Sequence, residues 1–400
     1  MPANKTPSAS TRLNKPVLRL SKLKSTSKKS AKTAHPPRVK KLTKKPTQKA
    51  KRRLNENFAK ALESKINSRL VIYEILAAVE SGMQLDTALE TNIALQKLED
   101  RDRRFARLLA TTTMRYRGQL EKLLAPLMQR RPFGEQTNAN LILLMGAAQV
   151  LLLKTGSHAA VDSTVELMRQ CGFERLCGLA NALMRRLTRE GETLLAATHP
   201  THNLPSWLQQ SWRHYWGDEA TKAIAELAML PPPLDISVKA DTLAWAKKLD
   251  AKHIDGSSLR REFDGDPSLF EGFNEGAWWV QDAAAALPAR LLHVSAGQSV
   301  IDLCAAPGGK SAQLIAAGGN VTAIDINQKR LDRLQHNLTR LKLEAKLMLC
   351  DGINFNPKNP VDAVLVDAPC SATGTIRRRP DILIQKETPD INRLQKTQWE

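Results

Sequence analysis

The sequence predicts a protein of mixed class, in which a C-terminal α/β domain with a doubly wound parallel sheet follows an all-α domain and a small mixed subdomain. Two patterns lead to this prediction. Between residues 66 and 187, apolar side chains recur every three or four positions, as in amphipathic helices. From residue 299 onward, short apolar runs alternate with helical patterns, as in a parallel sheet with crossover helices. A chain of 400 residues has room for two or three domains.

Residues 1–55 form a basic tail that we expect to be disordered. Residues 1–53 contain 18 lysines or arginines, six prolines and no acidic residue, whereas the rest of the chain carries 42 basic and 40 acidic residues. The formal net charge of +20 is therefore concentrated in the tail. Such a segment attracts any polyanion without sequence preference. An RNA tether and a merely solubilising extension are equally open, and a transit peptide is disfavoured by the prolines and the excess of lysine.

Residues 56–190 are predicted to form the all-α domain. Its most apolar run, LILLMGAAQVLLLK (141–154), is too short to span a bilayer and indicates a buried core helix, so we expect no membrane contact. Cys171 and Cys177 are interpreted as core residues on a helical stretch. The five cysteines show no CxxC pair and no zinc-ligand spacing, so we expect no metal, no disulfide framework and a cytoplasmic location.

Residues 191–285 are predicted to be a linker and a small mixed α/β subdomain. The linker concentrates aromatic residues near basic ones, namely Trp207, Trp212, Tyr215 and Trp216. Such side chains could stack on bases. The packing of a short amphipathic helix is the more frequent explanation and is preferred here. Pro231 to Pro233 mark the turn into the subdomain.

Residues 286–400 are predicted to form a Rossmann-like domain. The expected strands are SVIDLC (299–304), NVTAIDI (320–326), AKLMLCD (345–351) and VDAVLVDAP (361–369), and the expected helices are KSAQLIAAG (310–318) and QKRLDRLQHNLTRL (328–341). Doubly wound sheets bind ligands at the carboxyl ends of their strands. Four acidic residues lie at these ends: Asp302, Asp325, Asp351 and Asp367.

The segment DLCAAPGGKS (302–311) ends like a phosphate-binding P-loop but lacks its first glycine, because Cys304 stands in that position. The paired glycines still allow a ligand to approach the backbone closely. Asp325 follows Asp302 by 23 residues, at the end of the second strand, where an acidic residue binds a ribose diol. This combination favours an adenosyl ligand without a pyrophosphate, of which S-adenosylmethionine is the common one. A nucleotide hydrolase that uses GGKS and the strand VLVDAP is the weaker alternative.

The end of the fourth strand, DAPCSATG (367–374), indicates the chemistry. An exocyclic amine can attack a methyl group directly, whereas C5 of a pyrimidine becomes nucleophilic only after a thiolate has added at C6. The cysteine in this segment, Cys370, therefore favours carbon methylation over nitrogen methylation. A buried structural thiol is the alternative for this residue.

The segments VQDAAAALPARLL, DLCAAPGGK, AID, CDG and VDAPCSATGTIRRRPDI together resemble the RNA 5-methylcytosine methyltransferases. The helical domain that ends in ANALMRRL resembles the NusB-type fold. This arrangement is similar to the bacterial 16S rRNA cytosine-5 methyltransferase B family, over about residues 60 to 400. The resemblance implies a NusB-type all-α domain that binds RNA, followed by an S-adenosylmethionine-dependent methyltransferase domain. It also implies 16S rRNA as the partner.

The resemblance also implies roles for individual residues. The methionine part of S-adenosylmethionine would lie against Cys304, Ala305, Ala306, Pro307, Gly308, Gly309 and Lys310. Asp325 would bind the ribose hydroxyls, Asp351 would lie beside the adenine amine, and Asp367 would face the cofactor and the target base. Helix N-caps are the alternative for two of these acids, above all Asp351. The target phosphates would be contacted by Arg377, Arg378 and Arg379, for which a solvated run of charges is the alternative.

One family feature is missing from the 400 residues. In the family, a Thr-Cys-Ser cysteine on a later strand attacks the base, while the counterpart of Cys370 assists product release. The sequence contains no TCS and stops at Glu400, in an expected helix without a stop signal. We therefore expect a truncated chain whose sheet has an exposed apolar edge. A non-catalytic RNA-binding protein on the same scaffold is the main rival, a tail-driven RNA chaperone is another, and we expect a monomer.

Overall fold

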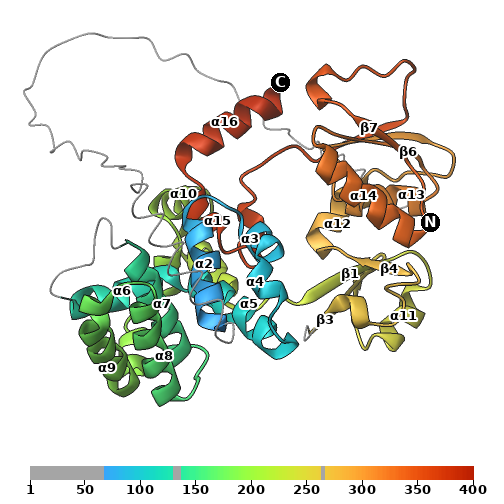
Figure 1. Ribbon diagram of the computed structural model, residues 1–400. Coiled ribbons are helices and arrows are strands. Elements are labelled where there is room, and N and C mark those ends of the chain that lie inside the picture. Colours follow the sequence, from blue (N-terminus) through green and yellow to red (C-terminus); the bar gives the residue numbers. More distant parts are fainter. Residues whose placement is uncertain (1–66, 129–136, 263–265) are drawn as a thin grey trace, which may run out of the picture. The chain divides into compact units, whose positions relative to one another are not determined.

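The computed structural model describes residues 67–128, 137–262 and 266–400 (Figure 1). The expectations for the basic tail therefore fall outside the described residues. Within the described ranges, no helix combines the length and the apolar composition that a membrane crossing requires.

The first part of the described chain is helical throughout, as predicted. The helix α2 begins directly after Asn67, whose side-chain oxygen accepts the backbone N–H of Arg69 at 3.0 Å and so caps the helix. The elements are α2 (Ser68–Glu80), α3 (Leu85–Thr91), α4 (Ile93–Gln96), α5 (Asp100–Arg115), α6 (Arg117–Leu124), the 3-10 turn η1 (Ala125–Leu127), α7 (Thr137–Leu151), α8 (Ser157–Gln170), η2 (Glu174–Leu176) and α9 (Cys177–Ala196).

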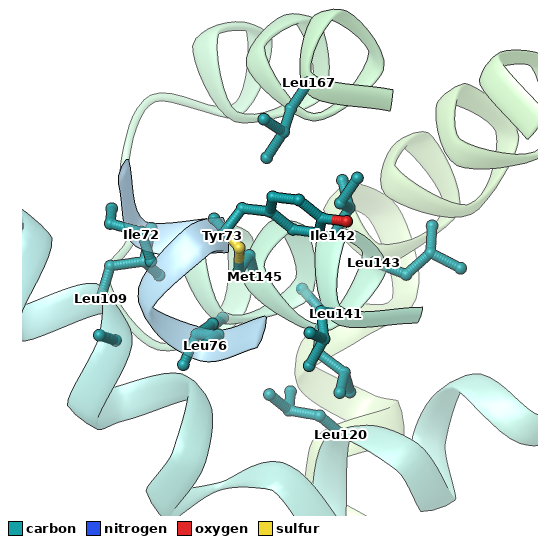
Figure 2. Close-up of a cluster of buried hydrophobic side chains, with 14 of the residues drawn as sticks. Ile72, Tyr73, Leu76, Leu109, Leu120, Leu141, Ile142, Leu143, Met145 and Leu167 are labelled. Atoms are coloured by element: carbon teal, nitrogen blue, oxygen red, sulfur yellow. The ribbon is translucent and has the colours of Figure 1, made fainter. Parts of the chain in front are cut away.

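Helix α7 is the centre of the helical core. Its residues Leu141 to Met145 are almost completely buried, and they pack with side chains of α2, α5, α6 and α8 (Figure 2). A helix that is apolar on all sides is stable in water only when neighbours cover it all round. The predicted buried core helix is thus confirmed. Cys171 and Cys177 do pack against this core, but not on one helix: Cys171 is the residue that follows α8, Cys177 is the first residue of α9, and η2 lies between them.

The aromatic linker forms η3 (Pro200–Asn203) and α10 (Ser206–Met229). Gly217 breaks α10 with φ 81° and ψ 172°, a conformation that glycine adopts without strain. Trp212 is buried among apolar residues, which agrees with the packing interpretation, whereas Tyr215 and Trp216 are exposed. The linker is therefore partly a core element and partly an aromatic surface.

The small subdomain contains a four-stranded antiparallel sheet of order β2-β3-β1-β4 in the described residues. Its elements are β1 (Leu234–Val238), α11 (Thr242–Lys248), β2 (Lys252–Asp255), β3 (Ser258–Arg261), η4 (Pro267–Leu269) and β4 (Trp278–Val280). Every residue of β1 is buried, and Trp278 fills the space beside it. Asp235 on β1 is neutralised by Arg260 through two hydrogen bonds of 2.7 and 2.8 Å, which makes its burial tolerable.

The C-terminal domain has a parallel sheet of order β7-β6-β5-β8 in the described chain, as the alternating pattern predicts. Its elements are α12 (Ala283–Leu291), β5 (Ser299–Leu303), α13 (Gly309–Ala316), β6 (Asn320–Asp325), α14 (Gln328–Leu341), β7 (Lys346–Leu349), η5 (Gly352–Asn354), β8 (Ala363–Val366), η6 (Thr373–Thr375), α15 (Ile382–Gln385) and α16 (Thr388–Trp399). Within this sheet β8 has a neighbour on one side, and Val364 and Val366 on it are exposed, which is the apolar edge expected above.

The strand order determines where the predicted site residues lie in the sheet. Because β5 lies between β6 and β8, the loop after β5 emerges in the middle of the sheet. Asp302 on β5 pairs in register with Ala323 of β6 and Leu365 of β8. The carboxyl ends of these strands therefore form one edge, at the point where the strand order reverses and doubly wound sheets bind their ligands.

Candidate active site

A cavity of about 400 Å³ lies over the loop that follows β5. We call it the loop cavity. It brings together every predicted residue from Cys304 to Lys310, with Asp302 and Asp367. The other side of the cavity comes from the small subdomain, from the start of α12 and from α14, and it consists of Phe273, Trp279, Val280, Gln281, Asp282, Ala285, Asn337, Arg340 and Leu341. Asp325, Asp351, Cys370 and the arginine run are not among its lining residues.

The loop has a fixed, unusual backbone. Cys304 and Gly308 adopt left-handed conformations, with φ of 60° and 102°. A Cβ on Gly308 would lie 3.0 Å from the side chain of Leu334, so this glycine serves both the turn and the packing of α14. From α14, Asn337 donates to the carbonyl of Pro307 at 2.9 Å, and Arg330 donates to the carbonyl of Ala306 at 2.7 Å. Helix α14 thus fixes the backbone of the loop at the border of the cavity.

Asp302 is a buried carboxylate with an unfilled acceptor. Its Oδ2 accepts the hydroxyl of Ser311 at 2.6 Å, whereas Oδ1 is buried without a partner among the described residues. Burial raises the pKa of Asp302 to about 6, against the opposing effects of Ser311 and Lys310. A buried acceptor on a cavity wall is suited to a ligand that carries hydrogen-bond donors or a positive charge.

Lys310 does not offer a free positive charge to the loop cavity. Its ammonium group donates to Asp367 at 2.6 Å, and its side chain is mostly buried. The lysine of a P-loop instead reaches the phosphates of the nucleotide. The Gly-Gly-Lys-Ser segment is therefore suited to a ligand other than a nucleotide triphosphate.

Asp325 lies beneath the loop. Its carboxylate accepts the backbone N–H of Ala306 at 3.3 Å and that of Asn327 at 3.1 Å, and it forms an ion pair of 3.2 Å with Arg330. A carboxylate has about four acceptor positions, so capacity for one more donor remains. The residue supports the loop, and its predicted contact with a ribose stays a prediction.

Asp351 caps the short turn η5. Its Oδ1 accepts the backbone N–H of Ile353 at 3.2 Å, which is the N-cap arrangement considered above as the alternative for this residue. The cap does not exclude a ligand contact, so the predicted position beside an adenine amine stays a prediction.

The two cysteines near the site differ in environment. Cys304 lines the loop cavity, and burial together with Asp325 raises the pKa of its thiol. Because the thiolate is the reactive form, Cys304 is disfavoured as a nucleophile. Cys370 is exposed in the loop after β8, where its sulfur lies 3.4 Å from the backbone nitrogen of Ala372. An exposed thiol agrees poorly with the alternative of a buried structural residue.

The three arginines of the run after β8 bind protein groups. Arg377 donates to the carbonyls of Leu230 and Pro231 at 3.1 and 2.7 Å. Arg378 forms an ion pair with Asp282 at 3.0 Å, and Arg379 lies 3.8 Å from a carboxylate oxygen of Asp86. The run is therefore not simply a solvated charge run, and its predicted contact with RNA phosphates stays a prediction.

Sequence reasoning missed the wall opposite the loop. Phe273 and Arg340 form it together, with the guanidinium 3.9 Å from the ring centroid. Gln281 and Asp282 also belong to it, and both stand in the segment VQDAAAALPARLL. No local pattern shows that residues before β5 in the chain fold back over the loop after it.

The fold and the site define an enzyme class. A parallel sheet whose strand order reverses beside β5, a loop with paired glycines after that strand and aspartates at the strand ends are typical of Rossmann-like domains. The unfilled carboxylate of Asp302 and the occupied ammonium of Lys310 make this site unlike that of a phosphate-binding hydrolase. This is the arrangement of an α/β methyltransferase domain.

Comparison with known proteins identifies the family. A family model described as 16S rRNA methyltransferase RsmB/F matches residues 289–400, and the NusB family model matches residues 66–189. Proteins named ribosomal RNA small subunit methyltransferase B from Pseudomonas putida and Pseudomonas syringae pv. tomato are 36% and 34% identical over 84% of this chain, covering 81% and 79% of the relatives. This chain belongs to the 16S rRNA methyltransferase RsmB/F family, which confirms the resemblance.

A solved structure supports the same fold. The crystal structure of PH0851 superposes with a TM-score of 0.62 over 82% of this chain and 80% of that chain, at 20% sequence identity. The predicted fold class, a helical NusB-like region followed by an α/β methyltransferase domain, is therefore confirmed.

Because its carboxyl is buried, Asp302 should make the free energy of unfolding of the chain depend on pH. Its pKa rises from 3.8 to about 6 on folding, so its favourable contribution is complete below about pH 4 and is lost as the pH rises through about 6. Asp302→Asn should therefore gain stability relative to the parent chain by about 2 kcal/mol between pH 4.5 and 7.5. Urea unfolding at both pH values measures this difference. If the difference in unfolding free energy between Asp302→Asn and the parent chain were the same at both pH values, the burial of an ionisable carboxyl at this position would be contradicted.

Proposed function

We propose that this chain belongs to an enzyme that transfers the methyl group of S-adenosylmethionine to C5 of a cytosine in 16S rRNA. The observation that carries the proposal is the charge of the loop cavity. Three carboxylates line it, against two cationic side chains: Lys310, which is paired with Asp367, and Arg340, whose guanidinium donates to the backbone carbonyls of Phe273 and Trp278. Such a cavity favours a cationic ligand and disfavours the triphosphate of ATP.

The residues fit the cofactor. S-adenosylmethionine supplies an electrophilic methyl group on a sulfonium, and it carries a cationic amine. The unpaired Oδ1 of Asp302 is suited to accept from that amine, because it is the buried acceptor on the cavity wall. Pro307, Gly308 and Gly309 leave room for the ligand on the cavity side. The family resemblance assigns the ribose hydroxyls to Asp325, whose buried carboxylate lies beneath the loop. Trp279 and Phe273 give the wall opposite the loop an aromatic, apolar character.

Carbon methylation requires a cysteine. A thiolate adds to C6 of the cytosine, which makes C5 a nucleophile able to take the methyl group. A base then removes the proton from C5, and the C6–sulfur bond breaks to release the thiolate and the methylated base. The family resemblance assigns the attack to a Thr-Cys-Ser cysteine, a sequence that the 400 residues do not contain. It assigns product release to Cys370, and the exposed thiol after β8 is accessible for that role.

Calorimetric titration tests the cofactor. The 400-residue chain should bind S-adenosylmethionine and should not bind ATP with magnesium, because Lys310, the residue in the place of the P-loop lysine, is paired with Asp367 and carboxylates outnumber cations in the loop cavity. Binding is measured in preference to turnover because it does not require the attacking cysteine. Binding of ATP alone would overturn the methyltransferase proposal for this chain and favour the nucleotide hydrolase.

Cys370→Ala should leave the affinity for S-adenosylmethionine within about twofold of the parent value. The thiol is exposed and does not line the loop cavity, so its removal takes away no cofactor contact. The same titration measures this, with Cys304→Ala as the matched variant inside the cavity. A tenfold or greater loss on Cys370→Ala would mean that the residue binds the cofactor, which contradicts a role confined to product release.

A further inference from the structure

A second cavity of about 290 Å³ lies between the small subdomain and the helices α12 and α13. We call it the arginine cavity. Its charged and titratable lining residues are Lys239, Arg290 and His293, and no aspartate or glutamate lines it in the part of the chain that the structure describes. Trp279 lines both this cavity and the loop cavity.

Arg290 has donors that protein groups leave unused. Its Nη2 forms an ion pair with Asp255 at 2.9 Å, whereas Nε and Nη1 are buried and lack an acceptor among the described residues. The turn at Gly256 packs directly on the guanidinium: φ is 54° there, and a Cβ would lie 2.5 Å from Nη1. The guanidinium is therefore fixed in place with part of its hydrogen-bonding capacity unfilled.

The surroundings of the arginine cavity are basic. Lys239 donates to the carbonyl of Leu341 at 2.7 Å, and burial together with Lys342 and Arg340 lowers the pKa of its ammonium. His293 adopts a left-handed backbone conformation with φ 49°, which is uncommon for a residue with a side chain. Asp255 is the acidic residue that faces Arg290, and its carboxylate is already paired with that guanidinium. The cavity therefore has a positive potential and suits an anion.

The two cavities share a hydrogen-bonded wall. The indole N–H of Trp279 donates to Gln281 at 2.8 Å, and the amide of Gln281 donates to Gln313 at 2.7 Å. Gln281 lines the loop cavity, whereas Gln313 lines the arginine cavity. A group bound in one cavity is thus separated from the other by a single layer of buried side chains.

We propose that the arginine cavity binds a backbone phosphate of the RNA substrate, an inference that rests on the proposed function. The guanidinium of Arg290, which lines the cavity and is only partly satisfied by protein groups, supplies one positive charge to a bound phosphate, and Lys239 supplies a second. Phosphate contacts fix the position of a nucleic acid on a protein without reading its sequence. A strand anchored here passes beside the wall of the loop cavity, which positions its neighbouring nucleotides for the site.

The test compares two double variants of the full chain. Lys239→Gln with Arg290→Gln removes two charges from the cavity, and Lys247→Gln with Lys358→Gln removes two exposed charges elsewhere. A 30-nucleotide RNA hairpin is titrated by fluorescence anisotropy from 100 to 400 mM KCl. The cavity variant should bind about tenfold more weakly than the control variant at 150 mM, and the slope of log affinity against log salt should fall by about one. Equal affinities and slopes would overturn the proposal.

Further measurements separate the possible failures. S-adenosylmethionine titration of each variant reports on the loop cavity, so loss of RNA binding with intact cofactor binding concerns the arginine cavity alone. Inorganic phosphate is titrated as well: if the cavity residues hold phosphate but RNA affinity does not depend on them, the site binds a free anion and the RNA assignment is wrong. If the cavity variant does not fold, acylation of the parent chain decides, since RNA should protect Lys239 and not Lys247. Equal rates with and without RNA would overturn the proposal.

Discussion

Asp325→Asn is expected to raise the dissociation constant of S-adenosylmethionine about 100-fold. The variant would lose the charge-assisted hydrogen bonds proposed between the carboxylate and the ribose hydroxyls, and each such bond contributes about 1.5 to 3 kcal/mol. The asparagine amide would also face the backbone N–H of Ala306 and the guanidinium of Arg330, two donors that now share Oδ2. Because the loop depends on both contacts, its cavity side would lose its fixed shape. Calorimetric titration measures the affinity.

A matched substitution and a modified ligand separate the two effects. Asp332→Asn makes the same change at an exposed position of α14, where the carboxylate accepts from Gln328, and should leave affinity unchanged. The 2′-deoxy form of the cofactor should bind the parent chain more weakly than the natural form does. The Asp325→Asn variant should bind the two forms with equal affinity. A variant that still discriminates between the two would place the ribose contact elsewhere. Parental affinity in Asp325→Asn would contradict both effects.

The α/β domain could be predicted in detail because its signals are local. The helix from Gln328 to Leu341 has the predicted bounds, since Asn327 caps its start and Lys342 ends it in a left-handed conformation. The strands β5 and β6 are short apolar runs next to turn residues, a pattern that requires no knowledge of distant contacts. Local chemistry therefore determines these elements.

The site was predictable only where one segment supplies it. The loop from Cys304 to Lys310 is contiguous, so its glycines and its position after a strand identify it. The wall opposite depends on the small subdomain lying over α14, and the partners of the arginine run depend on contacts with Leu230 and Asp282. Such contacts arise from tertiary packing, which periodicity along the chain does not report. The placement of Asp325 beneath the loop is of the same kind.

Close packing of backbone on backbone in the helical region leads to the second large effect. Gly118 is the second residue of α6, and a Cβ there would overlap the carbonyl oxygen of His202 and lie 2.8 Å from Cα of Asn203. This approach allows a buried amide pair, in which Asn203 donates to Gln119 at 2.7 Å and accepts its backbone N–H at 2.8 Å. Gly118→Ala must separate the two segments and weaken these bonds.

The expected loss of stability for Gly118→Ala is therefore about 3 kcal/mol or more, because an inflexible backbone is overpacked and buried polar groups lose partners. Gly178→Ala is the matched control: it is also the second residue of its helix, but a Cβ there meets no atom within 4 Å. That change should be neutral or stabilise by up to about 1 kcal/mol, through helix propensity alone. Urea unfolding followed by helical circular dichroism compares them. Similar stabilities for the two variants would mean that α6 and η3 can move apart freely, and that the buried amide pair does not hold them together.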